Sequence, residues 1–467
     1  MRARRSADRP PSFSRLPRRE LLKGAVALPA VWWADRLLAQ AKPAGAAGPY
    51  DVAVIGAGVA GLAAAHDLLH AGKRVIVLEA RDRIGGRTRT EPFAGVPLDH
   101  GAQWFHQGDH NLLRWAAEEV GFRTEKQSTP NFFSGSSPAT DETKLAVLAS
   151  FAAIDYAIEE SGKELAKRGG DMSVAAGTAS VSNWPWYHFN SGIVGPIESG
   201  VEIAKLSLRD LGNSHTGDDY LVQGGMGAFV AKYFGGVPVT LSAPVSRIDW
   251  SGSSGVRLTT PAGTIEAGAV IVTVPSSLLA KGQPGFAPAL PAAYQDAFAK
   301  LPLGVFNKIA IDFSRDVFGG LATNSVVNPL VDREDTPLVF VKLWGSNVAI
   351  VLVGGERSIA LEKAGPAAMV DYGLSTLTSL FGSGILAARS GKTATTAWLS
   401  DPHSLGSYSY AVVGGSPARQ TLATPHADRI FFAGEHVSIQ SFTNVFGAYE
   451  TGRAAARQAL AKLARAA

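Results

Sequence analysis

The pattern of apolar and polar positions divides the start of the globular region into a strand, a helix and a second strand. Apolar residues fill Val52–Ile55, apolar positions recur at helical spacing up to His70, and a second predicted strand, apolar after its first residue, covers Arg74–Leu78. The glycines between the first strand and the helix are Gly56, Gly58 and Gly61. This order predicts a βαβ unit with parallel strands.

Farther along the chain the pattern is first helical and then strand-like. Residues 111–213 are mostly helical in pattern, with helical periodicity clearest in Asn111–Val120 and Thr143–Lys167. Between Val237 and Pro275, apolar and polar residues alternate and turns separate the runs, which predicts antiparallel strands. The remaining predicted elements are strands in Leu301–Phe313 and Leu338–Val353 and a helix over Ala367–Phe381. We expect these later elements to form a second sheet, antiparallel and accompanied by helices.

Composition and charge narrow the possible classes of protein. The 467 residues are 46% hydrophobic and 18% charged, which predicts a globular chain long enough for two domains. The formal charge of +4 comes from residues 1–41, where nine Arg and Lys residues outnumber three acidic ones, so the remaining chain carries −2. We therefore expect no nucleic-acid partner. The absence of cysteine excludes disulfides, thiolate catalysis and Cys-ligated metals.

Residues 1–41 are similar to a twin-arginine signal peptide. Arg18 and Arg19 precede two leucines, a modest apolar region spans Ala25–Ala34, and a small-x-small cleavage signal ends at Ala41. The apolar region is too short to span a bilayer. We expect export of the folded, cofactor-loaded protein to the periplasm without stable membrane insertion. A basic disordered tail is the alternative.

The first glycine-rich turn has the residues that a dinucleotide site needs. Gly56 permits a tight turn, Gly58 lets the backbone approach a pyrophosphate, and Gly61 lets the helix pack on the strand. The helix N-terminus presents N–H groups and a positive dipole end to the phosphates. Glu79, which ends the second strand, can accept hydrogen bonds from both ribose hydroxyls. An ordinary glycine-rich turn is the less favoured interpretation.

A second glycine turn follows Glu79 and indicates a flavin rather than a nicotinamide cofactor. Gly85 and Gly86 form this turn, and Arg87 can place a bidentate guanidinium on a pyrophosphate oxygen. The run EARDRIGGR, which includes Arg81 and ends at Arg87, resembles the fingerprint of the flavin-dependent amine oxidases, the family of monoamine and polyamine oxidases. The resemblance implies FAD as the cofactor, with Arg81 among the residues that bind it.

The resemblance extends to other cofactor-binding segments. It implies that Val245 lies near the adenine, that the FAGE run at 432–435 contacts the ribityl-pyrophosphate region, and that a helix start near residue 447 faces the flavin ring. The cofactor-binding residues that it adds are Val245, Trp398, Gly434, Glu435, Asn444 and Val445. Ser407 stands where some monoamine oxidases carry a flavin-linked Cys, so we expect the FAD to be bound non-covalently.

Lys308 is the first predicted catalytic residue. The strand pattern of LGVFNKIAIDF puts Lys308 on the same face as Phe306 and Ala310, opposite the face of Ile309. From the residue type alone, an exposed edge position is favoured and a buried functional position is the alternative. The resemblance reverses this order, because the family has a Lys here that holds a water against flavin N5.

Tyr408 and Trp398 are the predicted aromatic residues of the site. In the segment AWLSDPHSLGSYSY the resemblance makes Tyr408 one wall of an aromatic cage and packs Trp398 near the flavin ring. Plain core aromatics are the alternative. Asn444 occupies the position of the second cage Tyr of monoamine oxidases, which leaves Phe442 or Phe446 as candidates for the other wall.

His106 is the residue that indicates the class of amine. The run GAQWFHQG resembles a segment of polyamine oxidases, and the resemblance makes His106 face the substrate amine. A structural His is the alternative. Although His110 follows four residues later, Gly108 and Asp109 weaken a helix between them and no Glu follows the first His, so we expect no metal site.

These observations predict a two-domain α/β flavoprotein that oxidises amines. Residues 48–104, 219–284 and 397–467 are expected to form a discontinuous Rossmann-type FAD domain, and 105–218 and 285–396 a substrate domain. By resemblance, an amine C–H gives a hydride equivalent to flavin N5, the imine is hydrolysed, and O2 or a periplasmic electron acceptor reoxidises the flavin. A polyamine or secondary amine is favoured. Oxidation of a monoamine or alkaloid amine, electron transfer to a carrier and a desaturase-like activity are the alternatives.

Overall fold

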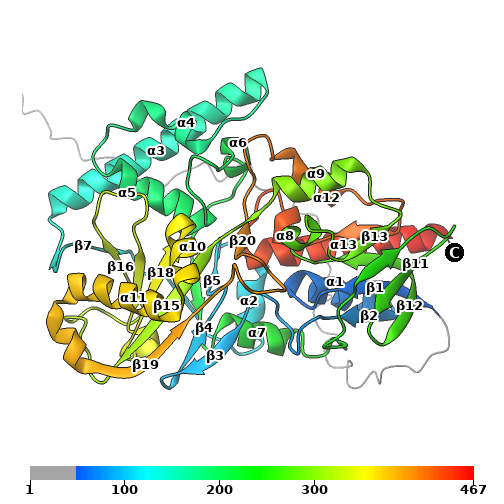
Figure 1. Ribbon diagram of the computed structural model, residues 1–467, viewed down its shortest axis with the longest axis horizontal. Coiled ribbons are helices and arrows are strands. Elements are labelled where there is room, and N and C mark those ends of the chain that lie inside the picture. Colours follow the sequence, from blue (N-terminus) through cyan, green and yellow to red (C-terminus); the bar gives the residue numbers. More distant parts are fainter. Residues whose placement is uncertain (1–48, 467) are drawn as a thin grey trace, which may run out of the picture. The chain divides into compact units, whose positions relative to one another are not determined.

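The predicted βαβ unit forms one end of the first sheet of the computed structural model, which describes residues 49–466 (Figure 1). The unit consists of β1 (Tyr50–Ile55), α1 (Val59–His70) and β2 (Val75–Leu78). β1 pairs in parallel with β2 on one side and with β12 (Gly263–Val272) on the other. Because both neighbours and both faces of β1 are covered, its last four residues are buried, which explains the continuous apolar run.

The rest of this sheet comes from later parts of the chain. β10 (Arg247–Asp249), β11 (Val256–Thr260) and β12 form the predicted antiparallel meander. The sheet is completed by β13 (Gly285–Ala287), which pairs with β10, and by β21 (Ile430–Phe432), which runs parallel to β12. The Rossmann-type arrangement is therefore confirmed.

Helices cover both faces of the first sheet. α1 packs against the C-terminal helix α13 (Val445–Ala466) on one face, and α9 (Ala292–Lys300) and α12 (Pro417–Ala423) share the core on the other. β13 and α9 follow residue 284, where the predicted domain boundary lies. The segment up to Lys300 thus packs with the first sheet, because its apolar residues complete that core.

The second sheet is antiparallel at all but one of its strand pairs. Its order is β19 (Arg389–Thr395), β15 (Phe306–Phe313), β18 (Val348–Gly354), β17 (Leu338–Val341), β16 (Ser325–Pro329), β7 (Asn131–Ser134) and β8 (Ser137–Pro138). β16 and β7 are parallel, which corrects the expectation of a purely antiparallel sheet. β7 and β8 also come from a stretch that was predicted as mostly helical. In Figure 1, α10 (Gly355–Ala364) and α11 (Pro366–Phe381) lie beside β15 and β18.

The helical segment between residues 111 and 213 matches the clearest periodicities. α2 (Leu112–Glu119) and α3 (Asp141–Arg168) confirm the two predicted helices. The segment continues through α4 (Val174–Gly177), α5 (Tyr187–Gly192), the π-helical turn η2 (Ile193–Ile197) and α6 (Leu208–Leu211). The turn η2 contains Pro196, and isolated π-helical turns often occur at functional sites.

Short pairings join the two sheets. They are β3 (Thr90–Phe93) with β4 (Val96–Asp99), β5 (Trp104–Phe105) and β6 (Thr124–Lys126) with β9 (Tyr220–Val222), and β14 (Leu303–Gly304) with β20 (Tyr408–Ser409). Leu98 and Leu221 pack against the second sheet, whereas Phe105 packs in the core around α1. The consecutive strands β4 and β5 therefore pack in different cores.

The remaining described elements are short helices. They are α7 (Met226–Tyr233), α8 (Ser276–Leu279), η1 (Ala179–Val181), η3 (Leu343–Gly345), η4 (Ser383–Ala388) and η5 (Glu435–Val437). None of the helices in residues 49–466 combines the length and apolar composition needed to span a membrane. The predicted twin-arginine signal, residues 1–41, lies outside the described residues.

Candidate active site

One cavity of about 870 Å³ collects the predicted site residues from segments far apart in the sequence. Its size lies near the upper end of the range for small-molecule and cofactor sites. The predicted cofactor residues that line it are Gly56, Gly58, Glu79, Arg81, Gly85, Gly86, Arg87, Val245, Trp398, Gly434, Glu435, Asn444 and Val445. The predicted catalytic residues Lys308, Tyr408 and His106 line the same cavity. Gly61 is the one predicted site residue that does not.

The two glycine turns lie against each other and leave room for a dinucleotide. Gly56 has φ of +100°, and a Cβ at Gly61 would lie 2.0 Å from the Gly56 carbonyl oxygen, so both positions require glycine. Gly85 N donates to Ala57 O at 2.8 Å, and nothing lies within 4 Å of a Cβ placed on Gly58. α1 begins without a side-chain cap. Its first N–H groups therefore suit a pyrophosphate, and the residues present fit the predicted FAD.

Glu79 and Arg81 follow β2 and lie beside this glycine turn. The Glu79 carboxylate is buried and accepts hydrogen bonds from Ala57 N at 2.6 Å and Arg81 N at 2.8 Å. These bonds fix the carboxylate at the end of β2, where a ribose is expected. The Arg81 guanidinium forms a bidentate pair with Asp401, with distances of 3.0 and 2.7 Å. Arg81 therefore holds the loop at residue 401 to the cavity wall.

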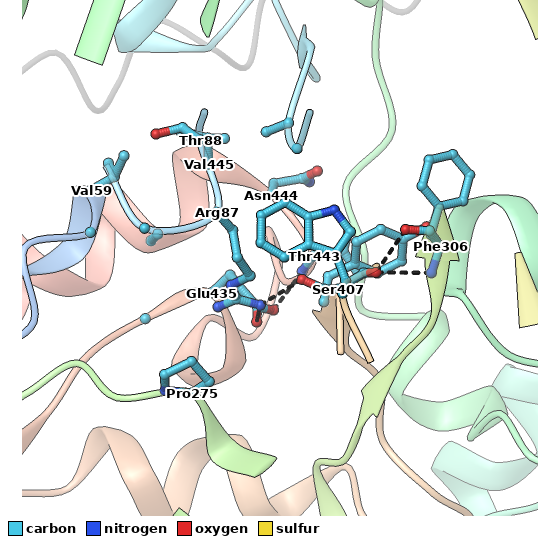
Figure 2. A pocket seen from close by; sticks show the side chains of 18 of the residues that line it. Val59, Arg87, Thr88, Pro275, Phe306, Ser407, Glu435, Thr443, Asn444 and Val445 are labelled. Carbon is cyan, nitrogen blue, oxygen red and sulfur yellow. Dashed lines mark hydrogen bonds and ion pairs between the residues drawn. The ribbon is translucent and has the colours of Figure 1, made fainter. Parts of the chain in front are cut away.

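Arg87 and Glu435 form an ion pair across the cavity (Figure 2). Arg87 Nη1 donates to Glu435 Oε1 at 2.9 Å and to Ser407 O at 2.8 Å. Glu435 Oε2 accepts from Ser409 Oγ at 2.7 Å and Thr443 N at 3.1 Å. Burial raises the pKa of Glu435, but the Arg87 guanidinium and further cationic and hydrogen-bonding neighbours outweigh it and hold the pKa at about 2. Glu435 is therefore an anion that positions Arg87.

A fully buried arginine, Arg419, is linked to Glu435 through the hydroxyl group of Ser409. Its guanidinium pairs with Asp210 at 2.8 Å and donates to Ser409 Oγ at 3.0 Å, while its face lies 4.2 Å from the ring centre of Phe442. Ser409 in turn donates to Glu435. Arg419 and Asp210 could not be predicted from the sequence, because one Arg in α12 and one Asp in α6 carry no motif.

Lys308 is buried, so the structure overturns the exposed-edge interpretation. β15 lies between β18 and β19, and only 3% of Lys308 is exposed. Its Nζ donates to Asp99 O at 2.8 Å and to Gln103 Oε1 at 2.7 Å. Burial lowers the pKa of Lys308 to about 8, against the opposing effect of the Asp99 carboxylate. The contact with flavin N5 stays a prediction.

Tyr408 faces an aromatic neighbour that the sequence analysis did not assign to the site. Its ring lies 5.9 Å from the ring of Phe306 at an angle of 43°, and both residues line the cavity. The Tyr408 hydroxyl donates to Ile197 O at 2.7 Å. Burial raises the pKa of Tyr408 well above its ordinary value. The strand pattern placed Phe306 on the same face as Lys308, and this was the sequence feature that could have identified Phe306 as a site residue.

The other aromatic candidates separate in the structure. Trp398 lines the cavity and its indole Nε1 donates to His100 O at 3.1 Å. Phe442 lines the cavity and its ring stacks against the Arg419 guanidinium. Phe446 instead packs into the core around α1. Ser407 Oγ accepts from Phe306 N at 2.8 Å and donates to Phe306 O at 2.9 Å, as Figure 2 shows. Ser407 therefore joins the Tyr408 segment to the strand of Lys308.

His106 belongs to a group of ionisable residues at the same cavity. Its Nδ1 lies 2.8 Å from Asp219 Oδ1. Burial lowers the pKa of His106, but the Asp219 and Glu198 carboxylates outweigh it and leave the pKa raised. Burial, together with the Asp219 and Asp155 carboxylates, raises the pKa of Glu198 to about 7. Glu198 and Asp219 were not predicted from the sequence, because they lie next to irregular segments.

Comparison with known proteins identifies the family. The chain matches the flavin containing amine oxidoreductase family over residues 59–146 and 185–460. It is 29% identical over 437 residues to polyamine oxidase 4 of Oryza sativa subsp. japonica, covering 88% of each protein. It is 28% identical over 441 residues to the lysine-specific histone demethylase 1 homolog 1 of the same plant, covering 86% of this chain and 51% of that protein.

Solved structures share the fold. Wild-type putrescine oxidase bound to putrescine has a TM-score of 0.74 at 21% identity, covering 90% of this chain and 100% of that one. Cyclohexylamine oxidase from Brevibacterium oxydans IH-35A has a TM-score of 0.75 at 22% identity, with the same coverage. The chain therefore belongs to the flavin-containing amine oxidoreductase family, and it is an FAD-dependent amine oxidoreductase.

Proposed function

We propose that this enzyme oxidises a polyamine-like or secondary amine and passes the electrons to O2, giving H2O2. The observation that carries this proposal is the group of His106, Asp219 and Glu198 at the cavity that also contains Lys308 and Tyr408. A second nitrogen on the substrate, charged at neutral pH, has carboxylate partners there. A small aryl monoamine has no group that would use them.

The electrostatics of Glu198 favour a cationic ligand. Its pKa of about 7 means that burial and neighbouring carboxylates disfavour its charged form. An ammonium group bound nearby would favour the carboxylate and lower this pKa again. Binding of a polycation would therefore release a proton near neutral pH, and the ammonium and the Glu198 carboxylate would form a charge-assisted hydrogen bond at the cavity wall.

The reacting nitrogen needs a different environment from the second nitrogen. FAD, when bound, accepts the hydride equivalent from the amine C–H and returns two electrons to the acceptor. The amine becomes an imine, which water hydrolyses to a carbonyl compound and a smaller amine. Tyr408 and Phe306 offer aromatic faces that suit a neutral amine, and the Lys308 amine lies on the same cavity wall.

The relatives support this substrate class. Polyamine oxidase 4 is a sequence relative over most of the chain, and putrescine oxidase shares the fold. Cyclohexylamine oxidase shares the fold equally well, so the fold by itself favours neither diamines nor monoamines. The choice between them depends on the carboxylates at the cavity.

A substrate panel tests the proposal. We would compare kcat/KM for spermidine, N-acetylated polyamines, nicotine-like amines and benzylamine with FAD-loaded protein across pH, and measure H2O2 directly. Spermidine or a secondary amine should give the highest kcat/KM. A preference for benzylamine would contradict the substrate class. Amine-dependent flavin reduction without O2 consumption would instead indicate a separate electron carrier.

Variants of Glu198 connect the preference to the cavity. Glu198→Gln removes the charge and keeps the shape, so the KM for a polyamine should rise about tenfold or more while the KM for benzylamine changes little. The control is Glu160→Gln, which removes one exposed carboxylate from α3. Equal changes for both substrates in Glu198→Gln would show that Glu198 does not select the amine. His106→Ala should weaken polyamine turnover in the same direction.

A further inference from the structure

The amine of Lys308 is held entirely by one short segment, Asp99–Trp104. Lys308 Nζ donates to Asp99 O at 2.8 Å and to Gln103 Oε1 at 2.7 Å, and lies 5.6 Å from the ring centre of Trp104. Asp99 ends β4, Gln103 lies in the connection and Trp104 begins β5, whereas Lys308 belongs to β15. Two of the hydrogen-bonding positions of the nitrogen are thereby used.

Gln103 differs from an amide that serves only the fold. It is 4% exposed and lines the cavity, and its side-chain oxygen accepts a hydrogen bond from Lys308. Its Nε2 has no hydrogen-bond partner among the described residues. Since buried polar groups are usually paired, a residue chosen for packing alone would avoid this amide. The Lys308 nitrogen donates both bonds, so the oxygen of Gln103 must be the end that faces it.

The Asp99–Trp104 segment is hydrogen-bonded to the backbone at Arg87, next to the second glycine turn. Ala102 N donates to Arg87 O at 3.2 Å, and the Trp398 indole donates to His100 O at 3.1 Å. A Cβ at Gly101 would lie 1.8 Å from Arg87 O, so the two backbones are in close contact. Gln103 therefore presents its oxygen from a rigid position that is set by the Arg87 segment.

We propose that Gln103 is a positioning residue for Lys308: its oxygen and the Asp99 carbonyl hold two positions of the amine nitrogen and turn the third toward the cavity. A neutral amine has two N–H groups, and both are then used, which leaves its lone pair facing the cavity. An ammonium instead turns its third N–H there. The same geometry lets Lys308 accept or donate a proton at the reacting end of the site. The position of the Lys308 amine does not depend on the proposed amine oxidation; only the role of Gln103 in turnover rests on that proposed function.

The surrounding charges make this amine sensitive to residue 103. The charged or titratable groups that interact with Lys308 among the described residues are the Asp99 side chain and His100, and Asp99 is already bonded to Met226 N at 2.9 Å. The pKa of Lys308 is about 8 with a neutral amide as its acceptor. A carboxylate at 103 would favour the ammonium, whereas loss of the acceptor would favour the neutral amine.

Carbon NMR of the lysine side chains tests the proposal without amine turnover. In FAD-loaded protein labelled with [ε-13C]lysine, the Lys308 signal is assigned by its absence from Lys308→Met. It should titrate near pH 8 in the unaltered protein. Gln103→Glu should move the midpoint up by about one pH unit or more, and Gln103→Met should move it down. If both variants leave the midpoint unchanged, the proposal is overturned.

Gln127 provides the matched control. It is an amide at the same cavity, bonded to Trp104 Nε1 and Asn324 O and not to Lys308. Gln127→Glu and Gln127→Met should shift the Lys308 midpoint less than the corresponding changes at Gln103. Equal shifts would mean that the overall charge in the cavity, and not the contact with Gln103, determines the pKa of the Lys308 amine. FAD content and circular dichroism report whether each variant folds, and Gln103→Met keeps the test open if the charged variant does not.

A kinetic measurement shows the consequence for the site. Enzyme reduced with dithionite is mixed with O2, and the reoxidation rate is followed against pH; no amine is needed. The pH midpoint of this rate should move with the NMR midpoint in Gln103→Glu. Parallel movement in a protein that oxidises none of the tested amines would keep the role of Gln103 and reject the proposed substrate. A shift of the NMR midpoint without any change in the pH profile of reoxidation would mean that Gln103 does not influence flavin reoxidation through Lys308.

Discussion

At the scale of single residues, Glu435 places one buried negative charge between Arg87 and the Ser409 hydroxyl. Its ordinary pKa of 4.5 falls to about 2 in the folded protein. A lowered pKa contributes stability that is fully present above 4.5 and is lost as the pH falls toward about 2. The difference corresponds to about 3 kcal/mol as an upper bound.

Glu435→Gln should therefore destabilise the protein at neutral pH much more than at pH 3. The measurement is the free energy of urea unfolding of both proteins between pH 7 and 3. Glu266→Gln, at an exposed position of β12, serves as the control and should show no such convergence. A constant difference across this pH range would contradict the assigned charge of Glu435. The variant should also release FAD more readily, because Arg87 loses its anchor.

Lys308→Met tests the chemistry of the same cavity. The variant should slow flavin reduction or reoxidation by on the order of 10²-fold while FAD content stays near normal, because the amine faces the cavity and does not hold the glycine turns. Stopped-flow absorbance of both half-reactions checks this. The control is Lys392→Met, an exposed lysine on the adjacent strand β19. Unchanged rates in both half-reactions would mean that Lys308 has a structural role and takes no part in flavin chemistry.

The sequence carried unequal information about the individual site residues. Alternation along β15 placed Phe306 beside Lys308, so the partner of Tyr408 could have been named from the pattern. Glu198 follows a π-helical turn and has no periodic context. Its importance depends on where Asp219 and His106 lie in space, and a single sequence without motif does not contain that distance.

At the scale of elements, length and periodicity decided what could be predicted. β1 and α1 were clear because a buried parallel strand and a packed helix leave long apolar signatures. β7 has four residues, and its pairing with β16 joins segments almost 200 positions apart. Such a short strand is stabilised by its neighbours, and its own residues give little local signal.

The π-helical turn η2 makes one element-level prediction possible. A Cβ at Gly354, at the end of β18, would lie 1.6 Å from Pro196 O, so an alanine there must displace this turn. The displacement would move Ile197, which accepts the Tyr408 hydroxyl, and the adjacent Glu198. Gly354→Ala should lower the free energy of unfolding by about 1–3 kcal/mol and raise the KM for the amine.

Denaturant unfolding and steady-state kinetics measure the two effects. FAD content should be unchanged, because among residues 49–466 η2 makes no hydrogen bond to either glycine turn. Gly384→Ala is the matched control, since nothing lies within 4 Å of a Cβ at that position and its φ is not positive. If Gly354→Ala keeps both stability and KM, the contact between β18 and η2 does not position the cavity wall.

At the scale of the whole molecule, two sheets that are each interrupted in sequence contribute to one cavity. The cofactor segments around Gly56, Arg87 and Glu435 come together because β1, the second glycine turn and β21 end near one another. The chain offers no cysteine to link a flavin, and Ser407 is bonded to Phe306. Acid precipitation should therefore release all yellow colour into the supernatant. Absorbance of the pellet and supernatant measures this, and colour retained in the pellet would indicate a covalent link.

We propose that the protein is exported from the cytoplasm after it has folded. A cavity built from several distant segments forms only after folding, so FAD is expected to bind before export, and a twin-arginine route would accept such a folded protein. We propose the twin-arginine route because Arg18 and Arg19 lie a few residues before two leucines and the apolar region Ala25–Ala34. In such a signal the two arginines would act through their guanidinium groups, and lysine keeps the charge but not that geometry.

Changing both Arg18 and Arg19 to Lys should keep the protein in the cytoplasm with FAD bound and with unchanged activity in cell extracts. The leader contains its own control: Arg4 and Arg5 form a second arginine pair that no apolar region follows. Changing both of these to Lys removes the same number of guanidinium groups and should leave export intact. The measurement is the share of flavin-loaded enzyme in periplasmic and cytoplasmic fractions. If the variants at 18 and 19 are delivered as well as the unaltered chain, the leader is not read as a twin-arginine signal, because the one feature that separates the two pairs would then have no effect.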